Sequence, residues 1–87
     1  MSRTLKDILA DTDSLRLQPW QEYVGEFAGL CEEQGFLIVE FSKCRLRFND
    51  PSPSAEILRD ELAGVEGRRV TILRTDLPDR PVVIKID

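Results

Sequence analysis

The chain has 87 residues, of which 41% are hydrophobic and 32% are charged, a balance typical of one small folded domain. Sixteen acidic residues outnumber twelve basic ones, and the net charge of −4 provides no overall attraction to nucleic acid or anionic lipid. The sequence contains no histidine, which excludes Ser-His-Asp and Cys-His catalytic sets and most catalytic zinc sites.

A short helix is predicted near the amino terminus, from about Leu5 to Ala10. Thr4 and Asp7 have the spacing of a capping-box variant, and apolar residues follow at helical spacing. The polar residues 11–14 end this helix because their short side chains compete for backbone hydrogen bonds. Residues 15–17 are then expected to be extended or to form a loop.

A second helix is predicted to begin at Pro19, since proline favours the first helical position. Gly35 is a natural terminator. Between them the apolar residues recur at helical spacing. This stripe consists of Trp20, Tyr23, Val24, Phe27, Leu30 and Cys31.

Two glycines interrupt the predicted second helix. Gly25 and Gly29 would each cost about 0.8–1 kcal/mol relative to alanine in a helix interior. Together with Ala28 they form a small-residue patch that another backbone could approach closely. Two interpretations stay open: an internal contact with the first helix, or a seam for a second copy or a protein partner.

Residues 36–48 predict a β-hairpin that reverses at Ser42 and Lys43. Apolar residues alternate up to Phe41, slip phase, and alternate again from Cys44. A reversal brings all of them to one face and sets Glu40 opposite Arg45, a favourable cross-strand pair. A long bulged strand is the alternative, since Ser-Lys lacks the Asn or Gly that tight turns prefer. The charge pair favours the hairpin.

A third helix is predicted from about Pro53 to Ala63, after a loop rich in proline and serine. Ser52 or Ser54 can cap it, and Pro53 is suited to the first position if Ser52 is the cap. Its apolar stripe consists of Ala55, Leu58 and Leu62, with Val65 just beyond.

A second hairpin is predicted from residues 68–75 and 81–86, which are rich in β-branched residues. One register places five apolar residues on the core face: Val70, Ile72, Val82, Ile84 and Ile86. Leu73 and Val83 then lie on the opposite face. That face is not wholly polar, which suggests that something covers it.

These elements predict one α+β domain over residues 1–87, with two layers and the order α-α-β-β-α-β-β. Two hairpins form a four-stranded antiparallel sheet, and the helices pack mainly on one face. The helices are expected to bury Trp20, Val24, Phe27, Leu58 and Leu62. Their partners on the sheet are expected to be Val39, Leu46, Ile72 and Ile84.

No motif for chemistry is present. The sequence has no glycine-rich phosphate loop and no metal-ligand spacing, so we expect no enzymatic activity, no cofactor and no metal. Cys31 and Cys44 are interpreted as buried free thiols in a reducing compartment. No segment approaches the roughly 18 apolar residues of a membrane span, and no signal-peptide run is present, so we expect a cytoplasmic protein without membrane contact.

The first functional hypothesis is a small, non-catalytic interaction or regulatory module that binds a protein partner or a second copy of itself. The residues expected to bind are Gly25, Gly29, Leu73 and Val83. The alternative is nucleic-acid binding through a basic patch on the strands. That patch would consist of Lys43, Arg45, Arg47, Arg68, Arg69 and Arg74, unless these residues pair with nearby acids.

Overall fold

The computed structural model describes residues 14–87, which form six strands and one helix. The elements are β1 (Ser14–Leu15), β2 (Glu22–Glu33), β3 (Phe36–Phe41), β4 (Cys44–Asn49), α2 (Pro53–Leu62), β5 (Arg69–Arg74) and β6 (Val82–Ile86). The strands form one sheet in the order β1-β4-β3-β2-β5-β6, in which β1 and β4 run parallel and the other neighbours run antiparallel. The fold is therefore α+β with a mixed sheet, and the prediction of four strands is wrong.

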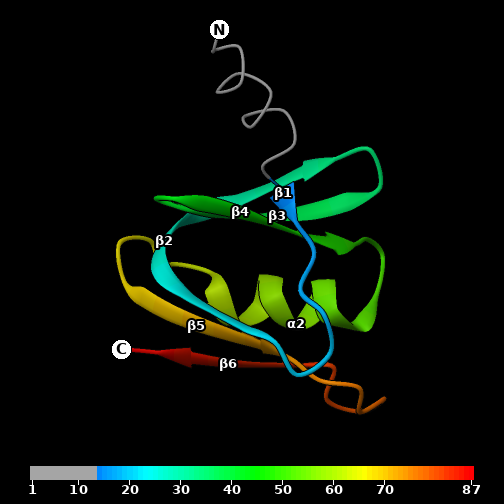
Figure 1. The fold of residues 1–87 in the computed structure, drawn as a ribbon. Coiled ribbons are helices and arrows are strands. Elements are labelled where there is room, and N and C mark those ends of the chain that lie inside the picture. Colours follow the sequence, from blue (N-terminus) through cyan, green and yellow to red (C-terminus); the bar gives the residue numbers. More distant parts are fainter. Residues whose placement is uncertain (1–13) are drawn as a thin grey trace, which may run out of the picture.

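Strand β2 bends the sheet into two halves. Its residues 22–26 pair with β5, whereas Phe27 and residues 29–33 pair with β3, and the register shifts between Phe27 and Gly29. Such a bulge kinks a strand and increases its twist. Figure 1 shows the result: β1, β3 and β4 lie on one side of α2, and β5 and β6 lie on the other.

The prediction of a helix over residues 19–34 is wrong, because this segment is β2. The bulge explains the error. Tyr23, Phe27 and Leu30 all pack against the core. Strand alternation through Gly25 sets Tyr23 and Phe27 four residues apart, and the extra residue at the bulge sets Phe27 and Leu30 three apart, which together imitate helical periodicity. The backbone of this segment instead forms hydrogen bonds with β3 and β5. As a helix, the segment would have been destabilised by its two interior glycines.

Trp20 and Val24 do not lie beneath the strands, contrary to the prediction. Trp20 lies in the turn before β2 with a φ of 66°, and 57% of its surface is exposed. Val24 is 39% exposed, because its neighbours Tyr23 and Gly25 take the inward positions of this part of β2. The first predicted helix, at about Leu5 to Ala10, lies outside the described residues.

The hairpin predicted for residues 36–48 is confirmed in its register. Phe41 lies opposite Cys44, Leu37 lies opposite Phe48, and Glu40 lies opposite Arg45. The Arg45 Nε and a Glu40 carboxylate oxygen are 3.5 Å apart. The sequence did not indicate that Ser14–Leu15 would extend this half of the sheet as a parallel strand.

The third predicted helix is confirmed as α2, which begins at Pro53 and is followed by the C-cap Ala63. Ser52 is the N-cap: its hydroxyl accepts a hydrogen bond from the Ala55 N–H at 3.1 Å. Ala55, Leu58 and Leu62 are completely buried.

The second predicted hairpin is confirmed as β5 and β6. Val70 and Ile72 are completely buried, and Val82 is nearly so. Ile84 is partly buried against the same core. Ile86 was expected on the core face, but at the end of the edge strand it is 37% exposed.

One apolar cluster joins both halves of the sheet to α2. It consists of Leu17, Phe27, Leu37, Val39, Phe41, Leu46, Phe48, Ala55, Leu58, Leu62, Val70, Ile72 and Val82. Within residues 14–87, α2 is too short to cross a membrane, and no other helix is present to do so.

Arg59 of α2 forms ion pairs with two acidic residues outside the helix. Its guanidinium donates to both carboxylate oxygens of Asp50, at 3.0 and 2.5 Å, and also to Glu32 of β2. The hydrogen bond from Arg59 holds the pKa of Asp50 below its ordinary value, although partial desolvation acts in the opposite direction. The ion pair therefore stabilises the fold when Asp50 is ionised.

We expect Arg59→Gln to lower the urea midpoint at neutral pH and to flatten its dependence on pH in the acid range. The contribution of Asp50 to folding stability is fully present above its unfolded pKa of about 3.9. It is lost as the pH falls through the lower pKa that Asp50 has in the folded protein. Urea unfolding of both proteins across that range tests this, with Arg80→Gln as the control for loss of a charge. A difference in urea midpoint between the wild type and Arg59→Gln that stays constant as the pH falls would contradict this expectation.

Candidate interaction surfaces

The two glycines expected to form a seam occupy different environments. A Cβ added at Gly25 would lie 2.8 Å from Tyr23 Cε2 and 3.2 Å from Phe41 Cδ2, whereas a Cβ at Gly29 would meet nothing within 4 Å. The Tyr23 and Phe41 rings meet edge to face, with centroids 4.7 Å apart. Gly25 therefore makes room for an internal aromatic pair. Gly29 is paired with Glu40 in the other half of the sheet.

Burial raises the pKa of Tyr23 above its ordinary value, and a hydrogen bond with Cys44 acts in the same direction. Tyr23 is accordingly a neutral phenol at physiological pH. It fills space beside Gly25 rather than supplying a reactive group.

Leu73 and Val83 lie directly opposite each other on β5 and β6, and both are half-buried. Their side chains point away from the core, because the alternate positions Ile72 and Val82 are buried within it. Val24 of β2 is diagonal to Leu73 on the same face, since Glu22 lies opposite Leu73 and Val24 lies opposite Thr71. We call Val24, Leu73 and Val83 the outer strip.

Charged residues border the outer strip with opposite signs on its two sides. On β2, Glu22 and Glu26 share the face of Val24. On the edge strand β6, Lys85 shares the face of Val83 and lies opposite Thr71. The strip therefore has Glu22 and Glu26 on its β2 side, where Glu26 lies opposite Arg69 of β5, and Lys85 on its β6 side.

Trp20 lies in the turn beside the end of β5. Its backbone N–H donates to the Arg74 carbonyl oxygen at 2.5 Å, which fixes it at the end of β5. With 57% of its surface exposed, it is a large aromatic side chain that the fold leaves available. Tryptophan is among the residue types that contribute most to protein interfaces.

The other half of the sheet has a charged outward face. Arg45 Nη2 donates to Glu33 at 2.7 Å and to the Cys31 Sγ at 3.8 Å, and Arg45 Nε approaches Glu40. Burial raises the pKa of the Cys31 thiol, Arg45 opposes this change, and the two glutamates reinforce it. Cys31 is thus held as a thiol rather than as a nucleophilic thiolate.

Arg47 differs from Arg45 on this face. Its guanidinium lies over the ring of Phe36, 5.3 Å from the ring centroid. Its Nε is buried and donates to no acceptor. Arg47 has no carboxylate partner among residues 14–87.

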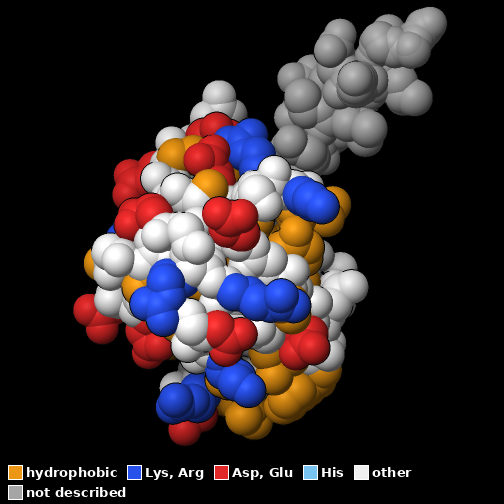
Figure 2. Space-filling model, turned by 90° about the vertical axis from the view of Figure 1, so that its left-hand side faces the viewer, with side chains coloured by type: hydrophobic (Ala, Val, Ile, Leu, Met, Phe, Trp, Pro, Cys, Tyr) orange, Lys and Arg blue, Asp and Glu red, His pale blue; other side chains and the backbone are white. Residues whose placement is uncertain are grey.

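The six basic residues expected to form one patch are divided among separate places. Lys43 and Arg69 line a shallow cleft at the bend of β2, where Glu26 also lies. Arg68 donates to the Asp87 carbonyl oxygen at 2.7 Å, and Arg74 donates to the Leu17 carbonyl oxygen at 2.6 Å. Figure 2 shows basic and acidic side chains interspersed on the face that it presents, with apolar side chains gathered along one margin.

Comparisons with protein-family models, with curated proteins and with solved structures find no match to this chain. Across residues 14–87, no three Cys, Asp or Glu side chains are grouped so that they could hold a metal ion. The function of the protein is therefore inferred from the geometry of its surfaces.

Proposed function

We propose that the protein is a small, non-catalytic interaction module that binds a second copy of itself through the outer strip. The observation that carries this proposal is the outward cross-strand pair of Leu73 and Val83, with the exposed Val24 beside it. The helix α2 covers the opposite face of these strands (Figure 1). Apolar side chains gathered on an uncovered sheet face are typical of interaction sites.

The charges beside the strip favour a second copy as the partner. A two-fold axis parallel to the strands would stack the outer faces of two sheets and set β2 of one copy over β6 of the other. Lys85 of the second copy would then lie over Val24, with Glu22 and Glu26 on either side of it along β2. Opposite charges across an interface favour association and fix its orientation.

The expected dimer is weak. Stable protein interfaces bury roughly 1,200–2,000 Å² in total, and a face three strands wide supplies less than this. Trp20, beside the end of β5, would add contact area and act as an aromatic anchor. We therefore expect association that depends on protein concentration, rather than a permanent dimer.

Sedimentation velocity over a range of protein concentrations tests self-association. We expect the sedimentation coefficient of the wild type to rise with concentration. Leu73→Glu is expected to abolish that rise, because Leu73 lies on the middle strand of the strip and the two-fold axis would place two buried glutamates against each other. Leu15→Glu is the matched control: Leu15 is 54% exposed but lies on β1, at the opposite edge of the sheet. A wild type that stays monomeric at every concentration would contradict the proposal.

Nucleic-acid binding is the second proposal, and the Arg47–Phe36 pair supports it. Base stacking on aromatic rings combined with cationic side chains is a common mode of binding single strands. The bent sheet from β2 to β6 is similar in outline to the partly open five-stranded barrel of OB-folds, whose second and third strands carry the binding face. The corresponding strands here are β3 and β4, which carry Phe36 and Arg47.

Fluorescence anisotropy with a labelled single-stranded oligonucleotide at low salt tests the second proposal. Arg47→Ala is expected to weaken binding and to reduce its salt dependence by about one phosphate contact. Arg45→Ala is the control and is expected to matter less, because Glu33 and Glu40 already neutralise Arg45. Absence of binding at low salt, where phosphate contacts are strongest, would exclude this function.

A further inference from the structure

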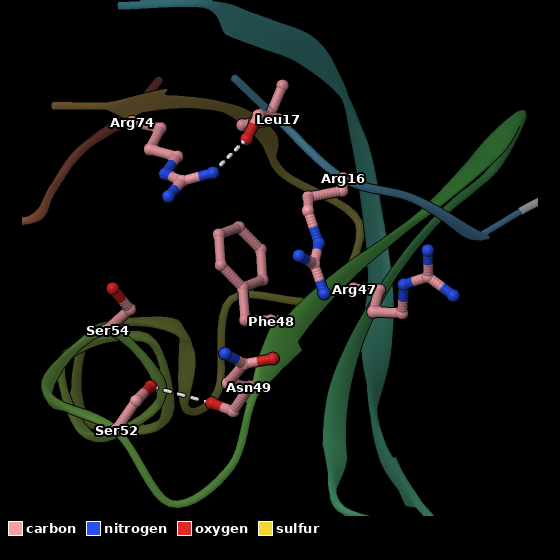
Figure 3. Close-up of a pocket in the computed structure, with 8 residues that line it drawn as sticks. All are labelled: Arg16, Leu17, Arg47, Phe48, Asn49, Ser52, Ser54 and Arg74. Atoms are coloured by element: carbon pink, nitrogen blue, oxygen red, sulfur yellow. Dashed lines mark hydrogen bonds between the residues drawn. The ribbon is translucent and has the colours of Figure 1, made fainter. Parts of the chain in front are cut away.

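A small cleft lies where the end of β4, the start of α2, the end of β5 and the segment after β1 meet. Its volume is about 120 Å³. Its lining consists of Arg16, Leu17, Arg47, Phe48, Asn49, Ser52, Ser54 and Arg74. Figure 3 shows the Phe48 ring between Arg16 on one side and Arg74 on the other, while the Arg47 side chain points away from the cleft.

The lining has three arginines and no carboxylate, although the whole chain is acidic. Arg74 donates one N–H to the Leu17 carbonyl oxygen, which leaves most of its five donors available. Arg16 is exposed, and within residues 14–87 no carboxylate forms an ion pair with either guanidinium. Two guanidiniums without acidic partners at one cleft form a local site of positive charge.

Polar groups from other elements complete the cleft. The Ser52 hydroxyl is already used, since it donates to the Asn49 carbonyl oxygen at 2.6 Å and accepts from the Ala55 N–H. The Asn49 side-chain amide and the Ser54 hydroxyl both line the cleft (Figure 3). The amino-terminal end of α2 adds a favourable potential for negative charge. Donors therefore surround the cleft from the β1 side, from β5 and from the start of α2.

We propose that this cleft binds a phosphate group, as a free ion or as a phosphate monoester. Two guanidiniums match the nearly two negative charges that a phosphate monoester carries at neutral pH. A cavity needs about 10–15 Å³ of this volume to hold one water molecule, so 120 Å³ has room for a small oxyanion. A carboxylate has one charge and two oxygens in a plane, and it would leave donors on one side of the cleft without a partner.

This inference is independent of self-association, because the cleft shares no residue with the outer strip. It also differs from the proposed nucleic-acid surface, where Arg47 packs on Phe36 and points away from the cleft. The ligand class is thus set by Arg16, Arg74, Asn49 and Ser54.

An NMR titration of the full chain with inorganic phosphate at constant ionic strength tests the proposal. We expect the amide signals of residues 16, 49, 54 and 74 to shift together and to saturate. Arg16→Gln is expected to weaken binding at least about tenfold, because it removes charge-assisted hydrogen bonds. Ser54→Ala is expected to weaken binding less, since a hydroxyl is a neutral donor. Arg80→Gln is the control, because Arg80 is exposed and lies outside the lining.

Parallel titrations with O-phosphoserine and with acetate identify the source of the phosphate. Tighter binding of O-phosphoserine than of inorganic phosphate would indicate a phosphorylated side chain as the ligand, and the reverse order would indicate the free ion. Equal binding of acetate, unchanged phosphate binding in Arg16→Gln, or shifts located elsewhere in the chain would each overturn the proposal.

Discussion

Phe27→Ala is expected to lower the free energy of unfolding by about 3–5 kcal/mol, the range for truncating a buried phenylalanine. Phe27 is only 1% exposed and meets the Phe41 ring edge to face, with centroids 6.3 Å apart. Its backbone is also the point where β2 changes partners. The Phe27 N–H donates to the Arg68 carbonyl oxygen at 2.9 Å, and its own carbonyl oxygen accepts from the Gly67 N–H at 2.8 Å.

Trp20→Ala is the matched control, because the helical spacing of the sequence placed both aromatic residues in the core. In the structure Trp20 is 57% exposed, so its truncation is expected to change the free energy of unfolding by about 0.5 kcal/mol or less, as for other surface substitutions. Urea unfolding monitored by far-UV circular dichroism measures both variants. Equal losses of unfolding free energy for Phe27→Ala and Trp20→Ala would mean that both side chains are buried, as the predicted helix requires. That result would contradict the strand β2.

The contrast between these two residues shows which parts of the fold the sequence could predict. The hairpin of residues 36–48 and the helix α2 were predicted correctly because their patterns are local. Alternation and one charge pair set the hairpin register, and Ser52 followed by Pro53 sets the start of α2. In each case the residues that determine the structure lie within a few positions of one another.

The identity of β2 could not be predicted in this way. Its two halves pair with β5 and β3, which are separated from each other by β4 and α2 in the sequence. The bulge after Phe27 shifts the inward positions by one residue, so that no single period describes the strand. Gly25 and Gly29 disfavour a helix. The apolar residues at helical spacing in the same segment nevertheless predict one.

The surface residues also divide into those whose placement a local pattern predicts and those whose placement depends on distant segments. Alternation along β5 and β6 predicted the outward placement of Leu73 and Val83, because it depends only on neighbouring residues. The predicted basic patch is only partly assembled: Lys43 and Arg69 line one cleft and Arg47 and Arg74 line another, while Arg45 pairs with acids. The cleft between Arg16 and Arg74 combines a segment before β2 with the end of β5, and no local pattern in the sequence indicates that approach.

Gly25→Ala is expected to destabilise the protein by about 1–3 kcal/mol, the usual cost of overpacking a core. The added Cβ would lie 2.8 Å from Tyr23 Cε2 and 3.2 Å from Phe41 Cδ2. Phe41 is 95% buried by its contacts with the core and cannot yield without moving its neighbours, and the partly buried Tyr23 ring packs edge to face against it. Urea unfolding measures the loss.

Gly29→Ala is the matched substitution four positions along the same strand. Nothing lies within 4 Å of its added Cβ, so the free energy of unfolding is expected to stay unchanged or to rise by up to about 0.5–1 kcal/mol, because alanine loses less backbone entropy than glycine. The same variant also tests the seam suggested by the sequence. If the backbone of a second copy packs against Gly29, Gly29→Ala will weaken self-association in sedimentation without loss of stability. If only the outer strip is used, association will be unchanged, because Gly29 lies in the half of β2 that pairs with β3 rather than β5.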